Sequence, residues 1–133
     1  MGALRGLIDL IFPPVCQVCR TPGAFPLCDS CRSAFRFIEP PVCRKCGKPL
    51  RGSPDLVFTC VPCRHRRLYF AAARAAGIYD GALREAIHAL KFGGCRALVV
   101  PLGSMMTKFV VADEQLRAAE LVVPVPLHRL ERR

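Results

Sequence analysis

The chain has 133 residues and a formal net charge of +10 at pH 7, and 52% of its residues are apolar. This apolar fraction excludes a disordered tail, and no apolar run is long enough to span a membrane as a helix. The length suits one domain or two small ones. Nine cysteines are far more than an ordinary cytosolic enzyme contains, which indicates either disulfides or bound metal.

The first residues, MGALRGLIDLIF, predict a short apolar helix over residues 3–12. The run is interrupted by Asp9 and stopped by Pro13 and Pro14, and no small-residue cleavage site follows, so it lacks the pattern of a secretion signal. It also lacks the serine or threonine of a myristoylation signal. We therefore expect a cytoplasmic protein with reduced thiols, in which metal binding explains the cysteines better than disulfides.

Eight cysteines form four CxxC motifs within residues 16–63. A CxxC turn brings two thiolates to one tetrahedral ion at about 2.3 Å each, and Gly47 can supply the positive φ that such a knuckle requires. The motifs can pair sequentially or interleave; we favour the sequential pairing because each half repeats a knuckle, a short apolar stretch and a knuckle. The sequence then predicts two closed, structural Zn²⁺ sites, one formed by Cys16, Cys19, Cys28 and Cys31 and the other by Cys43, Cys46, Cys60 and Cys63.

Metal also explains how residues 1–67 fold, since they contain few large apolar side chains for a segment of this length. They hold 11 basic and 4 acidic side chains, and eight thiolates around two Zn²⁺ ions lower their net charge by about four. The remaining basic excess is typical of a solvated surface, although a nucleic-acid-binding face stays open. His65 is an alternative ligand, and Cys95, outside any CxxC, is expected to be a small, partly buried residue.

The composition changes after residue 67. We expect a strand in the latter part of residues 69–79, although alanine-rich segments are ambiguous. The stretch DGALREAIHALKFGG predicts a helix over residues 80–92 that begins at the N-cap Asp80 and ends before Gly93 and Gly94. Its apolar side chains recur with helical spacing, so one face is expected to pack inward and to consist of Leu83, Ala86, Ile87 and Leu90.

A second helix is predicted over residues 101–111, with Pro101 at its first position. Its expected inner face consists of Leu102, Met105, Met106 and Phe109. The later stretch LVVPVP predicts an edge strand, or the exit of a strand into a loop, because Pro124 and Pro126 remove two donors from one side. The residues that follow include His128, Arg129, Arg132 and Arg133. Their side chains would suit phosphate groups bound at the carboxyl edge of an α/β sheet. The alternative is a solvated basic tail.

The order of these motifs resembles the ComF family. The residues that carry the resemblance are the two double-CxxC segments, then YDGALREAIHALKFGGCRAL, then VVPVPLHRLERR. ComF proteins join a double zinc ribbon to a type I phosphoribosyltransferase domain. The resemblance therefore implies a small metal-stabilised double zinc ribbon over residues 1–67, followed by the N-terminal part of an α/β type I phosphoribosyltransferase fold over residues 68–133.

In that family, two acidic residues hold the ribose hydroxyls of phosphoribosyl pyrophosphate (PRPP), and a Thr-Thr-Gly-like loop cradles its 5′-phosphate. The only adjacent acidic pair in this chain is Asp113-Glu114, which no such loop follows, so we expect a helix end and a connection there. The resemblance thus implies a chain truncated before the PRPP-binding motif, incomplete and catalytically inactive, with PRPP a cofactor only in a full-length form. It also implies that part of a pyrophosphate-facing loop is formed by Val125, Pro126, Leu127, His128 and Arg129.

Three functions follow as hypotheses. The resemblance implies a phosphoribosyltransferase-family protein linked to competence and DNA uptake, with single-stranded DNA or a helicase-type competence protein as partner. The second hypothesis is a zinc-ribbon module that binds single-stranded nucleic acid or a protein, and the third is a purely structural ribbon. The side chains expected to supply charge and stacking for the second are Arg32, Arg36, Arg44, Lys45, Lys48, Arg51, Arg64, Arg66, Arg67, Phe35, Phe37 and Phe58.

Overall fold

The computed structural model describes residues 13–53 and 58–125; the expected helix over residues 3–12 lies outside this part. The helices in chain order are α2 (Asp29–Ser33), α3 (Val61–His65), α4 (Gly81–Lys91), the 3₁₀ helix η1 (Arg96–Leu98), α5 (Val99–Ala112) and α6 (Glu114–Arg117). Between residues 13 and 53 and between 58 and 125 no strand is formed, and extended segments pair only at isolated bridges. No helix in these two ranges is long and apolar enough to cross a membrane.

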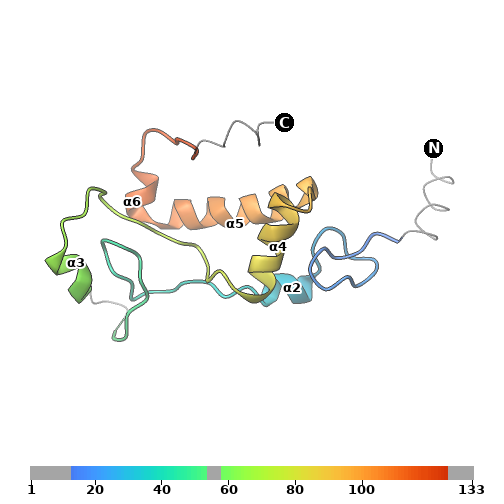
Figure 1. The fold of residues 1–133 in the computed structure, drawn as a ribbon, viewed down its shortest axis with the longest axis horizontal. Coiled ribbons are helices and arrows are strands. Elements are labelled where there is room, and N and C mark those ends of the chain that lie inside the picture. Colours follow the sequence, from blue (N-terminus) through green and yellow to red (C-terminus); the bar gives the residue numbers. More distant parts are fainter. Residues whose placement is uncertain (1–12, 54–57, 126–133) are drawn as a thin grey trace.

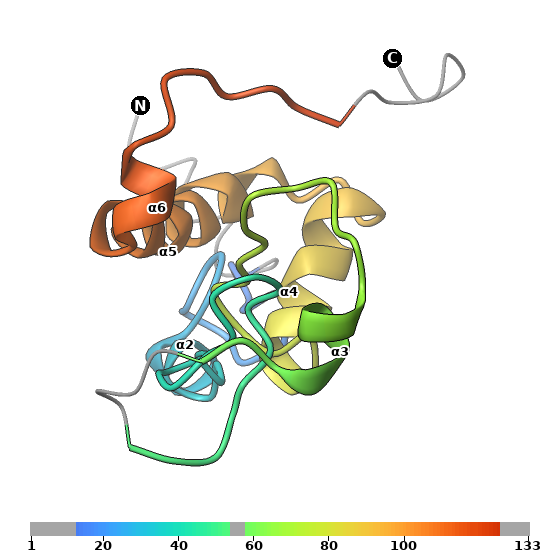
Figure 2. The same cartoon turned by 90° about the vertical axis from the view of Figure 1, so that its left-hand side faces the viewer.

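The two cysteine-rich segments lie toward opposite ends of the long axis of the molecule; α2 belongs to the first of them, and α4 lies between α2 and α5 (Figure 1). Helix α5 extends along the same axis, on one side of the cysteine-rich segments, and α6 follows it (Figures 1 and 2). Helices α5 and α6 therefore lie over a loop-rich layer that contains the short helices α2 and α3. Because no β-sheet holds that layer together within the described residues, its order must have another source.

Helix α4 forms as its sequence predicts. Leu83 and Ala86 are buried, and Ile87 and Leu90 are partly buried, so the predicted apolar face is confirmed. Asp80 occupies the N-cap position, but its side chain makes no cap hydrogen bond; instead its Oδ2 accepts a hydrogen bond of 2.5 Å from Nη1 of Arg36. The start of α4 is thus tied to the segment that follows α2.

Helix α5 begins at Val99, two residues before the predicted start, because η1 leads directly into it. Pro101 occupies the third helical position, where a missing N–H is still tolerated. Leu102 is buried and Met105 packs on the core, but Met106 is 46% exposed, so its predicted place on the inner face is wrong. It lies about 100° around the helix from Met105, on a side that no described element covers.

The strand expected in residues 69–79 does not form. Only Gly77 pairs, in a single antiparallel bridge with Phe37, which is flanked by hydrogen bonds from Ile38 to Ala76 (3.3 Å) and from Ile78 to Arg36 (2.8 Å). A Cβ on Gly77 would lie 2.7 Å from Cδ2 of Leu83 and 3.1 Å from Arg36 O, so the chain passes close to α4 here and a larger residue would make the buried Leu83 side chain shift. Residues 121–125 form no bridge with the other described residues, so the predicted α/β sheet stays an expectation.

One hydrophobic core joins the first cysteine-rich segment to the helices. This core contains residues from both sides of residue 67. The division of the chain into domains over residues 1–67 and 68–133 therefore stays a prediction. The first segment supplies Cys16, Leu27, Cys31 and Phe35, and the helical part supplies Leu83, Ala86, Leu98 and Leu102. The core is small, so most of the stability must come from elsewhere.

Candidate metal centres

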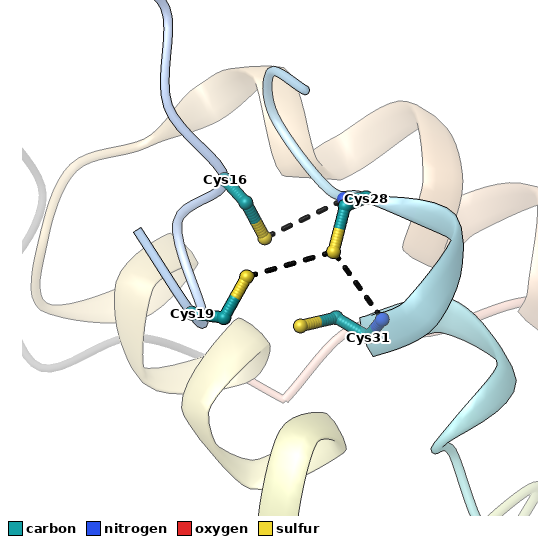
Figure 3. Close-up of side chains that lie close together, drawn as sticks. All are labelled: Cys16, Cys19, Cys28 and Cys31. Atoms are coloured by element: carbon teal, nitrogen blue, oxygen red, sulfur yellow. Dashed lines mark hydrogen bonds between the residues drawn. The ribbon is translucent and has the colours of Figure 1, made fainter. Parts of the chain in front are cut away.

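The first cluster consists of four sulfur atoms that point toward one another (Figure 3). The ligand atoms of Cys16, Cys19, Cys28 and Cys31 all lie within 4.8 Å of one another. Cys16 and Cys19 come from the first knuckle, whereas Cys28 is the N-cap of α2 and Cys31 lies within that helix. The second cluster repeats this plan with α3 in place of α2: Cys60 is the N-cap residue, Cys63 lies in the helix, and Cys43 and Cys46 come from the second knuckle.

The two knuckles share one backbone hydrogen-bond pattern. In the first, the N–H of Cys16 donates to Thr21 O and the N–H of Arg20 donates to Cys16 O, both at 2.9 Å. In the second, the N–H groups of Cys43 and Gly47 make the corresponding bonds to Lys48 O and Cys43 O, also at 2.9 Å. The bridges Val15–Pro22 and Val42–Pro49 close the two turns in the same way. The chain therefore contains an internal repeat whose unit is the metal knuckle.

Both knuckles require a positive φ at the same place. Gly47 has φ +69° there, and the first knuckle has Arg20 at φ +62°. An arginine in this region carries a steric cost that glycine avoids. Gly47 is also required by packing, because a Cβ would lie 2.6 Å from Ala73 O.

Backbone N–H groups point at the first sulfur of each cluster. The N–H of Cys28 lies 3.4 Å from Cys16 Sγ, and the N–H of Cys60 lies 3.3 Å from Cys43 Sγ. Burial raises the pKa of these two thiols, but several backbone N–H donors more than offset it and lower the pKa of each to about 6. These N–H groups stabilise negative charge on sulfur, which is the form that binds metal.

The last cysteine of each cluster has the opposite tendency. Burial raises the pKa of Cys31 to about 12, and hydrogen bonds with Cys28 and Cys19 act in the same direction. At Cys63 the hydrogen bond with Cys60 is the main cause of a pKa raised to about 12. A metal ion must displace these protons, so binding releases protons and weakens as the pH falls.

The sulfur geometry fits zinc. Four sulfurs at about 2.3 Å around a tetrahedral ion lie roughly 3.8 Å from one another. The Sγ atoms of Cys19 and Cys28 are 3.6 Å apart, and those of Cys46 and Cys60 are 3.7 Å apart. The cysteines are free thiols grouped in the sequential pairing, as the repeat predicted. Two sets of four thiolates are consistent with two structural Zn²⁺ ions.

Residues 7–65 match the family model described as a double zinc ribbon domain. The match spans both four-cysteine clusters. A double zinc ribbon domain is present in this chain. No curated protein and no solved structure matched the sequence. The ribbon containing Cys16 is called the first ribbon below, and the one containing Cys43 the second ribbon.

The other predicted site residues fall into separate places. His65 is exposed and outside both clusters, and Cys95 is partly buried against the core, as expected for a small packing residue. Val125 is 89% exposed. The remaining residues predicted for a pyrophosphate-facing loop, and the cations at the end of the chain, lie outside the described residues: Pro126, Leu127, His128, Arg129, Arg132 and Arg133.

The acidic pair is a helix connection, as predicted. Asp113 ends α5 and is the N-cap of α6, where its Oδ1 accepts a hydrogen bond of 3.0 Å from the Leu116 N–H. Its Oδ2 accepts a hydrogen bond of 2.9 Å from Nε of Arg74. Burial raises the pKa of Asp113. The Leu116 N–H and the Arg74 guanidinium lower it by more than burial raises it, so the pKa of Asp113 lies below its ordinary value.

Arg74 is the residue that sequence reasoning missed. Its guanidinium also donates from Nη1 to Arg44 O at 2.9 Å, and from Nη2 to Gln115 Oε1. Only 9% of its side chain is exposed. It therefore fastens the second ribbon to α6, across a sequence separation that no local pattern reveals.

Proposed function

We propose that the chain is a ComF-like protein in which the double zinc ribbon is a structural scaffold for the start of a phosphoribosyltransferase-like domain. The observation that carries this proposal is the shared core: Leu83 and Ala86 of α4 and Leu102 of α5 pack with Cys16 and Cys31 of the first ribbon. A ribbon that served only as a separate binding module would not need its ligands in the core of the following segment.

The donor sets support a scaffold instead of a catalytic centre. Each cluster offers four thiolates to one ion, which leaves no coordination position for water or substrate. In such a site the metal fixes the geometry of the chain and contributes to folding. What these residues do is hold two knuckles and the short helices α2 and α3 in place.

The proposal includes no phosphoribosyl transfer by this chain alone. Asp113 is already engaged by Arg74 and by the N-terminus of α6, so it is not available to hold ribose hydroxyls. We therefore expect isothermal titration of the zinc-loaded chain with PRPP to give no binding.

The test of the ComF assignment is the gene itself. Sequencing through and beyond the codon for Arg133 is expected to reveal, in the same or a neighbouring frame, a hydrophobic strand followed by two acidic residues and a Thr-Thr-Gly-like loop. The absence of any such frame would contradict the assignment. The scaffold role of the zinc is tested independently, by the cysteine variants C31S and C63S.

A second candidate function, binding of single-stranded nucleic acid, rests on the surface of the second ribbon. Phe58 is 39% exposed there, and the guanidinium of Arg67 lies over the ring of Tyr69, 5.8 Å from its centroid. Six arginine and lysine side chains in this part of the chain are exposed: Arg44, Lys48, Arg51, Arg64, Arg66 and Arg67. Five other residues predicted for such a surface do not belong to it. Phe35 is buried, Arg36 is paired with Asp80, Lys45 is only half-exposed, and Arg32 and Phe37 lie in α2 and just after it.

This candidate has a direct test. Charge reversal at Arg64, Arg66 and Arg67 should abolish binding of a labelled oligothymidylate, and binding by the unchanged protein should weaken steeply with salt. If the affinity does not change between low and moderate salt, or survives the charge reversal, nucleic-acid binding by this surface is contradicted. The scaffold role is then the one function that stays proposed.

A further inference from the structure

An open groove of about 840 Å³ separates the first ribbon from α5. One wall comes from residues 26–38, and the other from one face of η1 and α5 between Ala97 and Phe109. The floor includes the buried residues Leu27 and Phe35, whereas Phe37 and Val100 on the rim are 51% and 72% exposed. A groove of this size holds several apolar side chains of a ligand.

The α5 wall is a stripe with helical spacing. Val100, Ser104 and Lys108 recur every four residues, with Pro101, Met105 and Phe109 beside them. At 1.5 Å per residue, the stripe from Val100 to Phe109 is roughly 14 Å long. An elongated ligand fills such a stripe better than a compact small molecule, and a helix of about 10 residues has the same length.

The charges of the groove are of one sign. Of the 14 lining residues, 11 are apolar, and the polar ones are Arg32, Ser104 and Lys108. Arg32 and Lys108 are exposed, and within the described ranges neither forms an ion pair with an acidic side chain. The cations lie on opposite walls, so carboxylates along both edges of an apolar ligand would meet them.

We propose that this groove binds an acidic amphipathic helix of a protein partner, with apolar side chains on the floor and carboxylates at Arg32 and Lys108. A single strand of nucleic acid fits less well, because the floor is mostly aliphatic and only two cations face the groove. A second copy of the chain would bring another strongly basic molecule against the same cations. The inference goes beyond the scaffold role and does not depend on any domain that follows.

The probe is a fluorescein-labelled peptide of leucine, phenylalanine and glutamate, with its apolar residues at helical spacing. Fluorescence anisotropy with the full zinc-loaded chain should show saturable binding. The double variant R32E/K108E should weaken binding about tenfold or more, because it places like charges opposite the peptide. The variant S104W, which fills the groove without changing its charge, should weaken it by a similar factor. Zinc content and far-UV circular dichroism report whether each variant folds.

The matched control reverses the same number of charges outside the groove. Lys91 and Arg96 are exposed and do not line it, so K91E/R96E should change the affinity by no more than about twofold, as expected of distant charges screened by salt. If R32E/K108E fails to fold, R32Q/K108Q takes its place.

Four results would overturn the proposal. The first is equal weakening by the control pair and the groove pair, and the second is equal binding of a peptide with lysine in place of glutamate. The third is an oligothymidylate that displaces the peptide and depends on Arg32 and Lys108. The fourth is self-association of the chain that S104W abolishes, which would make a second copy the occupant.

Discussion

The two ribbons have the same knuckle but different surroundings. Both turns make the same backbone hydrogen bonds, and the first cysteine of each is fully buried. In the first ribbon, Cys16 and Cys31 belong to the core that includes α4 and α5. The second ribbon lies outside that core and is fastened by polar contacts of Arg74 and by the close approach of Gly47 to Ala73. Four cysteines in each ribbon set the same local geometry, and the tertiary contacts make the two unequal: apolar packing holds the first ribbon, and mainly polar contacts hold the second.

The largest expected difference is between the two metal sites. Structural zinc contributes on the order of 10 kcal/mol to the folding of a small ribbon. The variant C31S should lose about one zinc and, because Cys31 lies in the core with Leu83, should also lose amide protection in α4. The variant C63S should lose about one zinc and keep that protection. Zinc analysis with hydrogen exchange of α4 measures both; equal loss of protection would mean that the two sites are equivalent for the fold.

Truncating a core side chain tests how much apolar packing stabilises the first ribbon and the helices. Leu98 is fully buried in the cluster that joins the helices to the first ribbon. L98A should lower the free energy of unfolding by about 3 kcal/mol, through lost burial and a cavity. Urea unfolding of the zinc-loaded chain, followed by circular dichroism, measures this. L121A, at a position 77% exposed, is the control and should change the value by less than about 0.5 kcal/mol.

Exchanging the residue with positive φ tests how alike the knuckles are. G47A should cost about 2 kcal/mol, since it combines an unfavourable φ with a Cβ that meets Ala73 O. R20G, at the corresponding position, should be neutral or stabilise by up to about 1 kcal/mol, because glycine relieves the strain. Thermal unfolding of the two variants gives the comparison. A larger loss for R20G than for G47A would show that the side chain of Arg20 has a packing role.

The smallest expected effect concerns the contact between the second ribbon and α6. R74Q and D113N should each lower the free energy of unfolding by about 1 kcal/mol, because each variant removes the charge but keeps an amide that can still make part of the hydrogen bonds. In a double-mutant cycle the two losses should not add, as expected for directly interacting groups. Additive losses would mean that Arg74 acts through Arg44 O and Gln115 alone.

Much of the metal chemistry was predictable from the sequence because its determinants are local. The spacing of the cysteines places two sulfurs of each CxxC on one turn. The repeat favoured the sequential grouping over the interleaved one, and the structure confirms it. Helix α4 was predictable for the same reason, since its caps and its apolar face lie within one segment. The exposure of Met106 was not, because periodicity gives the width of an apolar face but not which side a neighbour covers.

The sequence alone determined that eight thiolates would form two closed sites, because a ligand and its partner three residues later share one turn. The tertiary structure decided that the first site belongs to the core and the second does not, that residues 76–78 pair with residues 36–38 instead of forming a sheet strand, and that Arg74 ties the second ribbon to α6. These features depend on contacts between residues 30 or more positions apart. Such contacts are fixed by how the surfaces fit together, which no local pattern encodes.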